Sequence, residues 1–180
     1  MTSQPDARPT PGATTVTTTT TASMAAIECR AVRRDFASGN SVVHALAGID
    51  LRVELGELVA VRGRSGSGKT TLLNVLGGLD QPTSGEVFLD GRQLGSLTRG
   101  ELTNLRRREI GFIFQGFGLL PILSAAENVE IPLRMVSTES AIRTARVAEV
   151  LDLVGLAGRA GHRPTELSGG EQQRVAIARA

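Results

Sequence analysis

The stretch that most constrains this chain is "GRSGSGKTT", residues 63–71, which carries three glycines and the only lysine of the sequence. It follows the apolar run "LVAV" (58–61) and precedes "TLLNVLGGL" (71–79). Branched apolar residues in the first run predict a strand, and the spacing in the second predicts a short helix. A strand, a glycine-rich loop and a helix in this order predict a backbone that closes around an anion at the helix N-terminus.

Each residue type of this loop has a chemical reason, because Gly63, Gly68, Lys69 and Thr70 fit the pattern G-x-x-x-x-G-K-[ST]. Glycines let several N–H donors converge on a polyphosphate, and lysine is a compact charge where the planar fork of arginine does not fit. The Thr70 hydroxyl suits Mg²⁺. We therefore predict a site for a nucleoside triphosphate with Mg²⁺. The alternative, a glycine-serine linker, disagrees with the core-forming runs on both sides. The predicted nucleotide-binding residues of the loop are Gly63, Arg64, Ser65, Gly66, Ser67, Gly68, Lys69, Thr70 and Thr71.

The rest of the sequence alternates strand-like with helix-like segments, which predicts an α/β domain with a largely parallel sheet covered by helices. Thr98 and Glu101 have the spacing of a capping box that opens a helix, and Gly155 is placed to end another. The expected strands are 27–32, 49–53, 58–61, 86–91 and 110–114; the expected helices are 71–79, 98–108 and 140–154, the last with Val147, Val150, Leu151 and Val154 on one face.

Length and composition favour one domain preceded by a tail. Residues 1–25 are rich in threonine and proline and predict a disordered tail, so the domain is expected at 26–180. Cys29 is the only cysteine, which excludes an intrachain disulfide and fits a reducing cytosol, and we expect it to be a buried structural thiol. No apolar run has the length of a membrane span or of a signal peptide. The net charge of +2 gives little support to a nucleic-acid partner. We predict a cytoplasmic protein.

A second glycine-rich motif, "LSGGEQQRVAIARA", occupies residues 167–180. Ser168 and Glu171 have capping-box spacing, so one interpretation is simply a helix start. That interpretation leaves Gly169 and Gly170 unexplained, since each glycine costs a helix about 1 kcal/mol relative to alanine. The motif therefore also predicts a second place where a phosphate approaches a helix N-terminus closely.

The two motifs together resemble the Walker A loop and the signature motif of ABC-transporter ATPase domains. This resemblance implies a P-loop NTPase fold with a helical subdomain. It also implies ATP as the nucleotide and a homodimer or paired ATPase subunit arranged head to tail. Ser168, Gly169 and Gly170 would then contact the γ-phosphate that the partner holds.

Two further residues acquire roles only from the resemblance. Gln115, in "FIFQGFGLLP", matches the family's Q-loop, where glutamine contacts Mg²⁺ and the attacking water and the loop senses the transmembrane subunit. Phe36, in "RDFASGN", matches the aromatic that stacks on adenine, where tyrosine is usual. From the residues alone, Gln115 would be a polar strand end and Phe36 a core residue.

The segment between the motifs narrows the resemblance. "FQGFGLLPILSAAENVEIPL" is similar to the subgroup of lipoprotein-release, macrolide-export and cell-division ATPases. This implies a transmembrane permease as partner and a position on the inner face of the cell membrane. For the run Arg106–Arg108 we expect a solvated helix end, with contact to the permease or to anionic lipid as the alternative.

In this family the signature helix leads into a Walker B strand ending in Asp-Glu, then a D-loop and a switch histidine. The sequence ends at Ala180, before all of these, and His44 and His162 both precede the signature. We therefore expect no catalytic residue within these 180 residues and a longer protein that hydrolyses ATP. Two alternatives stay open: a non-catalytic nucleotide-binding module, and a soluble ABC ATPase that acts on DNA or the ribosome.

Overall fold

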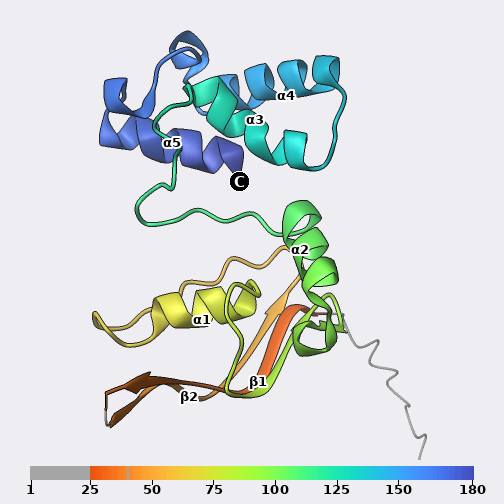
Figure 1. Cartoon of the computed structure of the whole chain (residues 1–180), viewed down its shortest axis with the longest axis vertical. Coiled ribbons are helices and arrows are strands. Elements are labelled where there is room, and N and C mark those ends of the chain that lie inside the picture. Colours follow the sequence, from red (N-terminus) through yellow and green to blue (C-terminus); the bar gives the residue numbers. More distant parts are fainter. Residues whose placement is uncertain (1–24, 40) are drawn as a thin grey trace, which may run out of the picture.

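The computed structural model describes residues 25–39 and 41–180, and in it the chain forms two parts (Figure 1). One part joins a sheet to the helices α1 and α2, and the other consists of the helices α3, α4 and α5. The predicted tail lies outside the described residues except for Ala25, which begins the first strand.

The sheet has four strands in the order β2-β1-β3-β4, and all its pairs are antiparallel. Their bounds are β1 Ala25–Ser38, β2 Ser41–Glu54, β3 Ser84–Leu89 and β4 Arg92–Gln93. Asp90 and Gly91, which join β3 to β4, have φ values of 45° and 73°. Positive φ at both central residues is the geometry that closes a tight hairpin. The prediction of a largely parallel sheet is therefore wrong for the described residues.

Two of the expected strands, 58–61 and 110–114, form no sheet ladder within the described residues. Leu58 is 98% exposed and Phe114 is 47% exposed, while Ile110 and Phe112 are half-buried. Phe114 stacks on Phe112 with ring centroids 5.8 Å apart, and both rings line a hollow of about 670 Å³ beside α2 and α3. The prediction of a buried strand at 110–114 is wrong here, because a strand needs a neighbour for its backbone N–H and C=O groups.

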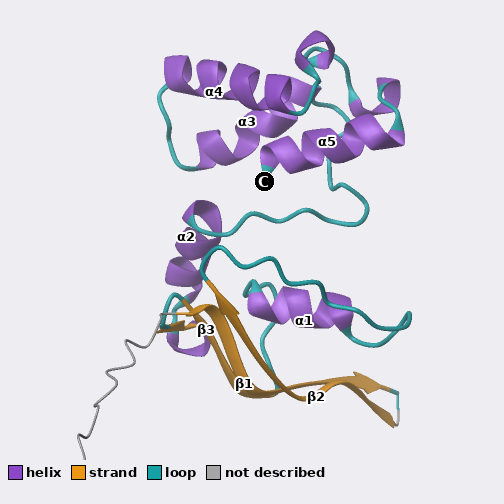
Figure 2. Ribbon diagram, turned by 180° about the vertical axis from the view of Figure 1, so that it is seen from behind, coloured by secondary structure: helices purple, strands orange, loops and turns teal. Residues whose placement is uncertain are grey.

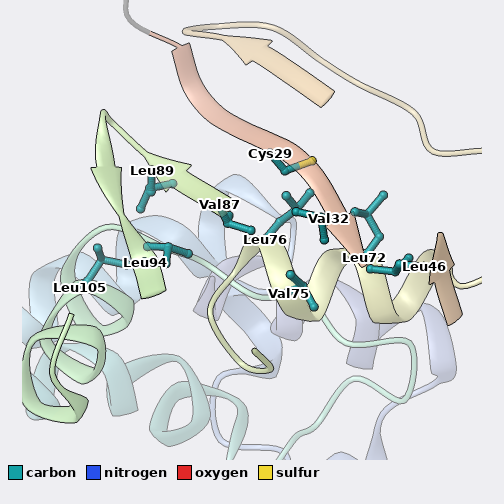
Figure 3. Packing of buried hydrophobic residues seen from close by; sticks show 10 residues of the cluster. All are labelled: Cys29, Val32, Leu46, Leu72, Val75, Leu76, Val87, Leu89, Leu94 and Leu105. Atoms are coloured by element: carbon teal, nitrogen blue, oxygen red, sulfur yellow. The ribbon is translucent and has the colours of Figure 1, made fainter. Parts of the chain in front are cut away.

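One hydrophobic core lies between the sheet, α1 (Lys69–Leu76) and α2 (Arg99–Arg108), as Figure 3 shows. The expected capping box is present, because Thr98 accepts a hydrogen bond from the Glu101 backbone N–H and the Glu101 carboxylate accepts one from the Thr98 backbone. The Cys29 thiol is free and buried, as expected, and burial raises its pKa. The core residues are Cys29, Val32, Leu46, Leu72, Val75, Leu76, Val87, Leu89, Leu94 and Leu105.

A second core joins α3 (Ala125–Met135), α4 (Ser140–Leu153) and α5 (Gly169–Arg179), the three helices at the top of Figure 2. The predicted face of α4 is confirmed, since Val147 and Leu151 are buried and Gly155 follows the helix with φ 69°. The short 3-10 helices are Leu94–Ser96, Ala157–Arg159 and Pro164–Glu166. The second core contains Ala125, Val129, Val147, Leu151, Leu156, Leu167 and Val175.

Asn128 is a polar side chain that is completely buried at the edge of this second core. Its amide Nδ2 donates to the backbone oxygens of Leu120, Leu123 and Ser124 at 2.9–3.1 Å, and its Oδ1 accepts from the Leu120 N–H at 2.8 Å. A buried amide with all its groups paired fixes the backbone around it. Asn128 therefore sets the path of the chain as it enters α3.

Candidate functional site

The loop at 63–71 is organised around its lysine. The Lys69 ammonium donates to the backbone oxygens of Gly63 at 2.9 Å and Arg64 at 2.7 Å, so the side chain folds back over the loop. The Ser67 N–H donates to the Arg64 oxygen at 3.2 Å and closes the turn inside it. The ammonium thus lies against two backbone carbonyls of the loop, where a polyphosphate would compete with them for its protons.

Gly68 locks this loop against the sheet. Its φ is 83°, and a Cβ atom built on it would lie 2.3 Å from the Ala45 backbone oxygen of β2. At Gly63 a Cβ would lie 2.4 Å from the Ser67 Oγ, whereas at Gly66, with φ 77°, it would meet nothing within 4 Å. Gly68 is therefore required by close packing against backbone and by its positive φ, and Gly66 by its positive φ, whereas a side chain at Gly63 would need only Ser67 to turn away.

The helix that follows the loop offers its N-terminus to an anion. Gly68 is the N-cap of α1, no side chain among the described residues caps this end, and the first turn holds no acidic residue. The first N–H groups of a helix have no partner within it, and together with the helix dipole they favour negative charge. Thr70 is exposed and Thr71 is half-buried in this first turn.

Phe36 lies on β1 near the same loop. It pairs with Val43 of β2, two residues before Ala45, whose oxygen packs against Gly68. Two residues span about 7 Å along a strand. The ring is 38% exposed, so the alternative that Phe36 is a core residue is wrong.

Gln115 lies far along the chain from the loop, in the exposed turn at 115–116. It is not a strand end, because the segment before it pairs with no strand of the described structure. Arg179 of α5 holds the backbone just after this turn, donating to the oxygens of Phe117 at 2.8 Å and Gly118 at 2.6 Å. Burial lowers the pKa of Arg179. The C-terminal end of α5 therefore supports the Gln115 turn.

The second glycine motif begins α5. Ser168 is its N-cap and accepts from the Glu171 N–H at 3.3 Å, while the Glu171 carboxylate accepts from the Ser168 N–H at 2.8 Å. Hydrogen bonds to the Glu171 carboxylate from the Ser168 backbone, and next from the Ser168 side chain, lower the pKa of Glu171. Gly169 and Gly170 are exposed, and a Cβ built on Gly169 would meet nothing within 4 Å. The fold itself therefore does not require glycine at position 169.

The structure gathers the predicted residues into two groups. The loop at 63–71 and Phe36 belong to the part with the sheet, whereas Ser168, Gly169 and Gly170 belong to the helical part (Figure 1). Arg34, Asp80 and Arg179 were missed by sequence analysis, because each acts through a contact distant in the chain, 46 residues for the pair Arg34–Asp80. No local pattern signals such a pair.

Comparison with known proteins assigns the fold and the family. The solved structure of the ATP-binding cassette MJ0796 as a dimer bound to ADP and Pi superposes with a TM-score of 0.81 and 43% identity, covering 85% of this chain and 68% of that one. A second dimeric structure of this bacterial ABC transporter cassette gives the same TM-score with 44% identity. The fold and the loop thus define an α/β P-loop NTPase domain of the ATP-binding cassette type. The family model of the ABC transporter matches residues 46–180, and the chain belongs to this family.

Two curated relatives are exporters. The chain is 55% identical over 154 residues to a macrolide export ATP-binding/permease protein of Rhodopseudomonas palustris and 52% identical over 155 residues to a pyoverdine export ATP-binding/permease protein of Pseudomonas syringae. Each match covers 86% of this chain and 24% of the relative. The chain therefore spans about a quarter of the length of these relatives.

Proposed function

We propose that the intact protein binds and hydrolyses ATP between two such domains and uses the cycle to drive a transmembrane permease that exports a substrate. The proposal rests on one observation. The Lys69 ammonium folds back over the loop, at a helix N-terminus that has no side-chain cap and no acidic residue in its first turn. Such an end attracts a polyphosphate, and the names of the export relatives supply the link to a permease.

In the proposed site the ammonium of Lys69 exchanges its two loop carbonyls for the β- and γ-phosphate oxygens, and the N–H groups around Gly68 hold the remaining ones. Phe36 stacks on the adenine. Thr70 and Gln115 supply neutral oxygens that suit Mg²⁺, an ion that neutralises phosphate charge and takes its other ligands from ATP and water. Both side chains are hydroxyl or amide groups at the surface, so their donor chemistry fits this ion.

The second domain of the pair would complete the site with Ser168, Gly169 and Gly170. The Ser168 Oγ already accepts the Glu171 N–H, but a hydroxyl carries one proton that it can donate. Turned from the Glu171 carboxylate to a γ-phosphate oxygen, this proton would let Ser168 contact the phosphate while its oxygen keeps the Glu171 N–H of the cap. The open space around Gly169 allows the phosphate to approach the backbone.

Partners and location follow from the same proposal. Among residues 25–39 and 41–180, no helix has both the length and the apolar character needed to cross a bilayer. The domain would lie on the inner face of the cell membrane and contact the permease through the turn that holds Gln115. The transported substrate would be selected by the permease.

The test is ATP hydrolysis by the intact protein with its permease, compared with Lys69→Ala and with Arg146→Ala as a surface control. We expect Lys69→Ala to abolish turnover and Arg146→Ala, an exposed residue of α4 paired with Glu149, to leave it unchanged. Turnover that survives Lys69→Ala would refute the proposal. Lys69-dependent ATP binding without turnover would favour the non-catalytic module instead.

A further inference from the structure

Arg34 lies between the ring of Phe36 and a carboxylate. Its guanidinium carbon is 4.4 Å from the centroid of the Phe36 ring, and its Nε donates to the Asp80 Oδ2 at 2.8 Å. The two charged side chains are only 25% and 27% exposed. A planar guanidinium suits both a carboxylate and an aromatic face, so Asp80 fixes the cation that covers the ring.

Asp80 is itself held firmly where the chain leaves α1. Its backbone N–H donates to the Asn74 oxygen at 3.2 Å, and its Oδ1 accepts from the Gln81 N–H at 2.8 Å. Arg34 therefore ties β1 to the exit of the helix that begins at Lys69.

A further pair of hydrogen bonds fastens the next residues along β1. The Thr83 N–H donates to the Arg33 oxygen at 2.8 Å, and the Asp35 N–H donates to the Thr83 Oγ1 at 3.0 Å. The backbone on either side of Arg34 is thus anchored to the same segment that carries Asp80. The arginine cannot leave the ring without breaking its ion pair.

The consequence for Phe36 is that one ring face is covered by a fixed cation. Phe36 as a whole is still 38% exposed, so the ring is not enclosed, and a base would have to approach it from the side away from Arg34. A free aromatic at the surface would offer both faces and several rotamers, and ordering it would cost conformational entropy when a base binds. With Arg34 over one face, the Phe36 ring offers its other face in one orientation, near the loop at 63–71 that would hold the phosphates.

We propose that Arg34, fixed by Asp80, is a positioning residue that makes Phe36 a one-sided platform for the nucleotide base. This inference rests on the proposed function, because it assumes that Phe36 stacks on the base of a bound nucleotide. Stacking on an aromatic ring tolerates any base. Arg34 therefore strengthens the hold on the base without selecting adenine over guanine.

The experiment measures dissociation constants by calorimetry in the intact protein for ATP, GTP and inorganic tripolyphosphate, which has phosphates but no base. Arg34→Met keeps an unbranched apolar stem and removes the charge. We expect it to weaken ATP and GTP alike by about two- to fivefold, the size of an exposed cation–π contact, and to leave tripolyphosphate unchanged. Asp80→Asn should reproduce the effect in weaker form. In a Phe36→Ala background Arg34→Met should add nothing.

The outcomes separate this inference from the proposed function. If Arg34→Met binds ATP as the parent protein does, or weakens tripolyphosphate as much as ATP, the inference is overturned, while ATP binding that depends on Lys69 keeps the proposed function intact. An effect of Arg34→Met that persists without the Phe36 ring overturns it as well. If the parent protein binds neither ATP nor tripolyphosphate, the proposed function fails and the inference fails with it. Unchanged tripolyphosphate binding also shows that the variant is folded.

Discussion

The two glycine-rich helix N-termini of this chain are built in opposite ways. At α1 the N-cap is Gly68 in a left-handed conformation, and this end has no side-chain cap and no acidic residue in its first turn. Lys69 is the first residue of the helix, and its ammonium folds back over the loop. At α5 the N-cap is Ser168, which is closed by Glu171 in a reciprocal pair of hydrogen bonds.

Each end is suited to a different kind of contact with phosphate. The α1 end has free N–H groups and a positive charge, so it attracts a polyphosphate without help. At the α5 end the N–H groups of Ser168 and Glu171 are already hydrogen-bonded, and the Glu171 carboxylate repels phosphate. This end suits contact with a phosphate that is already held elsewhere, which is the role expected of the signature motif in a pair of domains.

Lys69→Arg is expected to give the largest effect that tests this comparison. The positive charge is kept, but a planar fork cannot take the place of the compact ammonium that donates to the Gly63 and Arg64 oxygens. We expect ATP affinity to fall about 100-fold, or roughly 2.7 kcal/mol, close to the effect of Lys69→Ala. Titration with a fluorescent ATP analogue measures this. An affinity within twofold of the parent would show that charge alone matters at α1.

Matched glycine substitutions give the next effect, on the free energy of unfolding. Gly68→Ala meets a positive φ and the Ala45 oxygen, so we expect a loss of at least about 2 kcal/mol in urea unfolding. Gly169→Ala meets open space, and we expect it to be neutral or to stabilise by up to about 1 kcal/mol. It should nonetheless weaken ATP-dependent pairing of the domains. Equal destabilisation by both variants would contradict the contrast.

These two ends also show how far sequence analysis reaches. The Ser168–Glu171 and Thr98–Glu101 boxes are confirmed, because capping depends on residues three apart and on nothing else. The loop at Lys69 is likewise local. The helix after this loop begins at Lys69, two residues before the predicted start at 71.

Strand ladders and long-range side-chain contacts could not be predicted from the sequence, because they depend on residues far away in the chain. The runs at 58–61 and 110–114 have strand composition, but whether they form a ladder depends on a partner strand, and none of the described residues supplies one. The contacts Arg34–Asp80 and Arg179–Gly118 join segments 46 and 61 residues apart. No pattern of spacing encodes them.

Ser168→Ala should give a smaller effect, with Ser124→Ala as its matched control. Both serines open helices with the same capping box, so each substitution should cost about 1 kcal/mol in urea unfolding. Only Ser168→Ala should also weaken ATP-dependent pairing, because only that hydroxyl is expected to reach a phosphate. If Ser124→Ala weakens pairing as much, the effect comes from stability and not from contact.

The smallest effect we expect is in the pH dependence of the α5 cap. Hydrogen bonds from Ser168, that of its backbone first, hold the pKa of Glu171 below the ordinary value of 4.5. A carboxylate whose pKa is lowered by folding stabilises the folded state above its ordinary pKa, and this contribution is lost as the pH falls through the lowered value. Glu171→Gln cannot titrate, so its urea midpoint should lie below that of the parent at neutral pH. The two midpoints should converge on acidification, since a protonated Glu171 and a glutamine are both neutral.

A constant gap between the two curves would mean that the charge of Glu171 adds nothing to the cap.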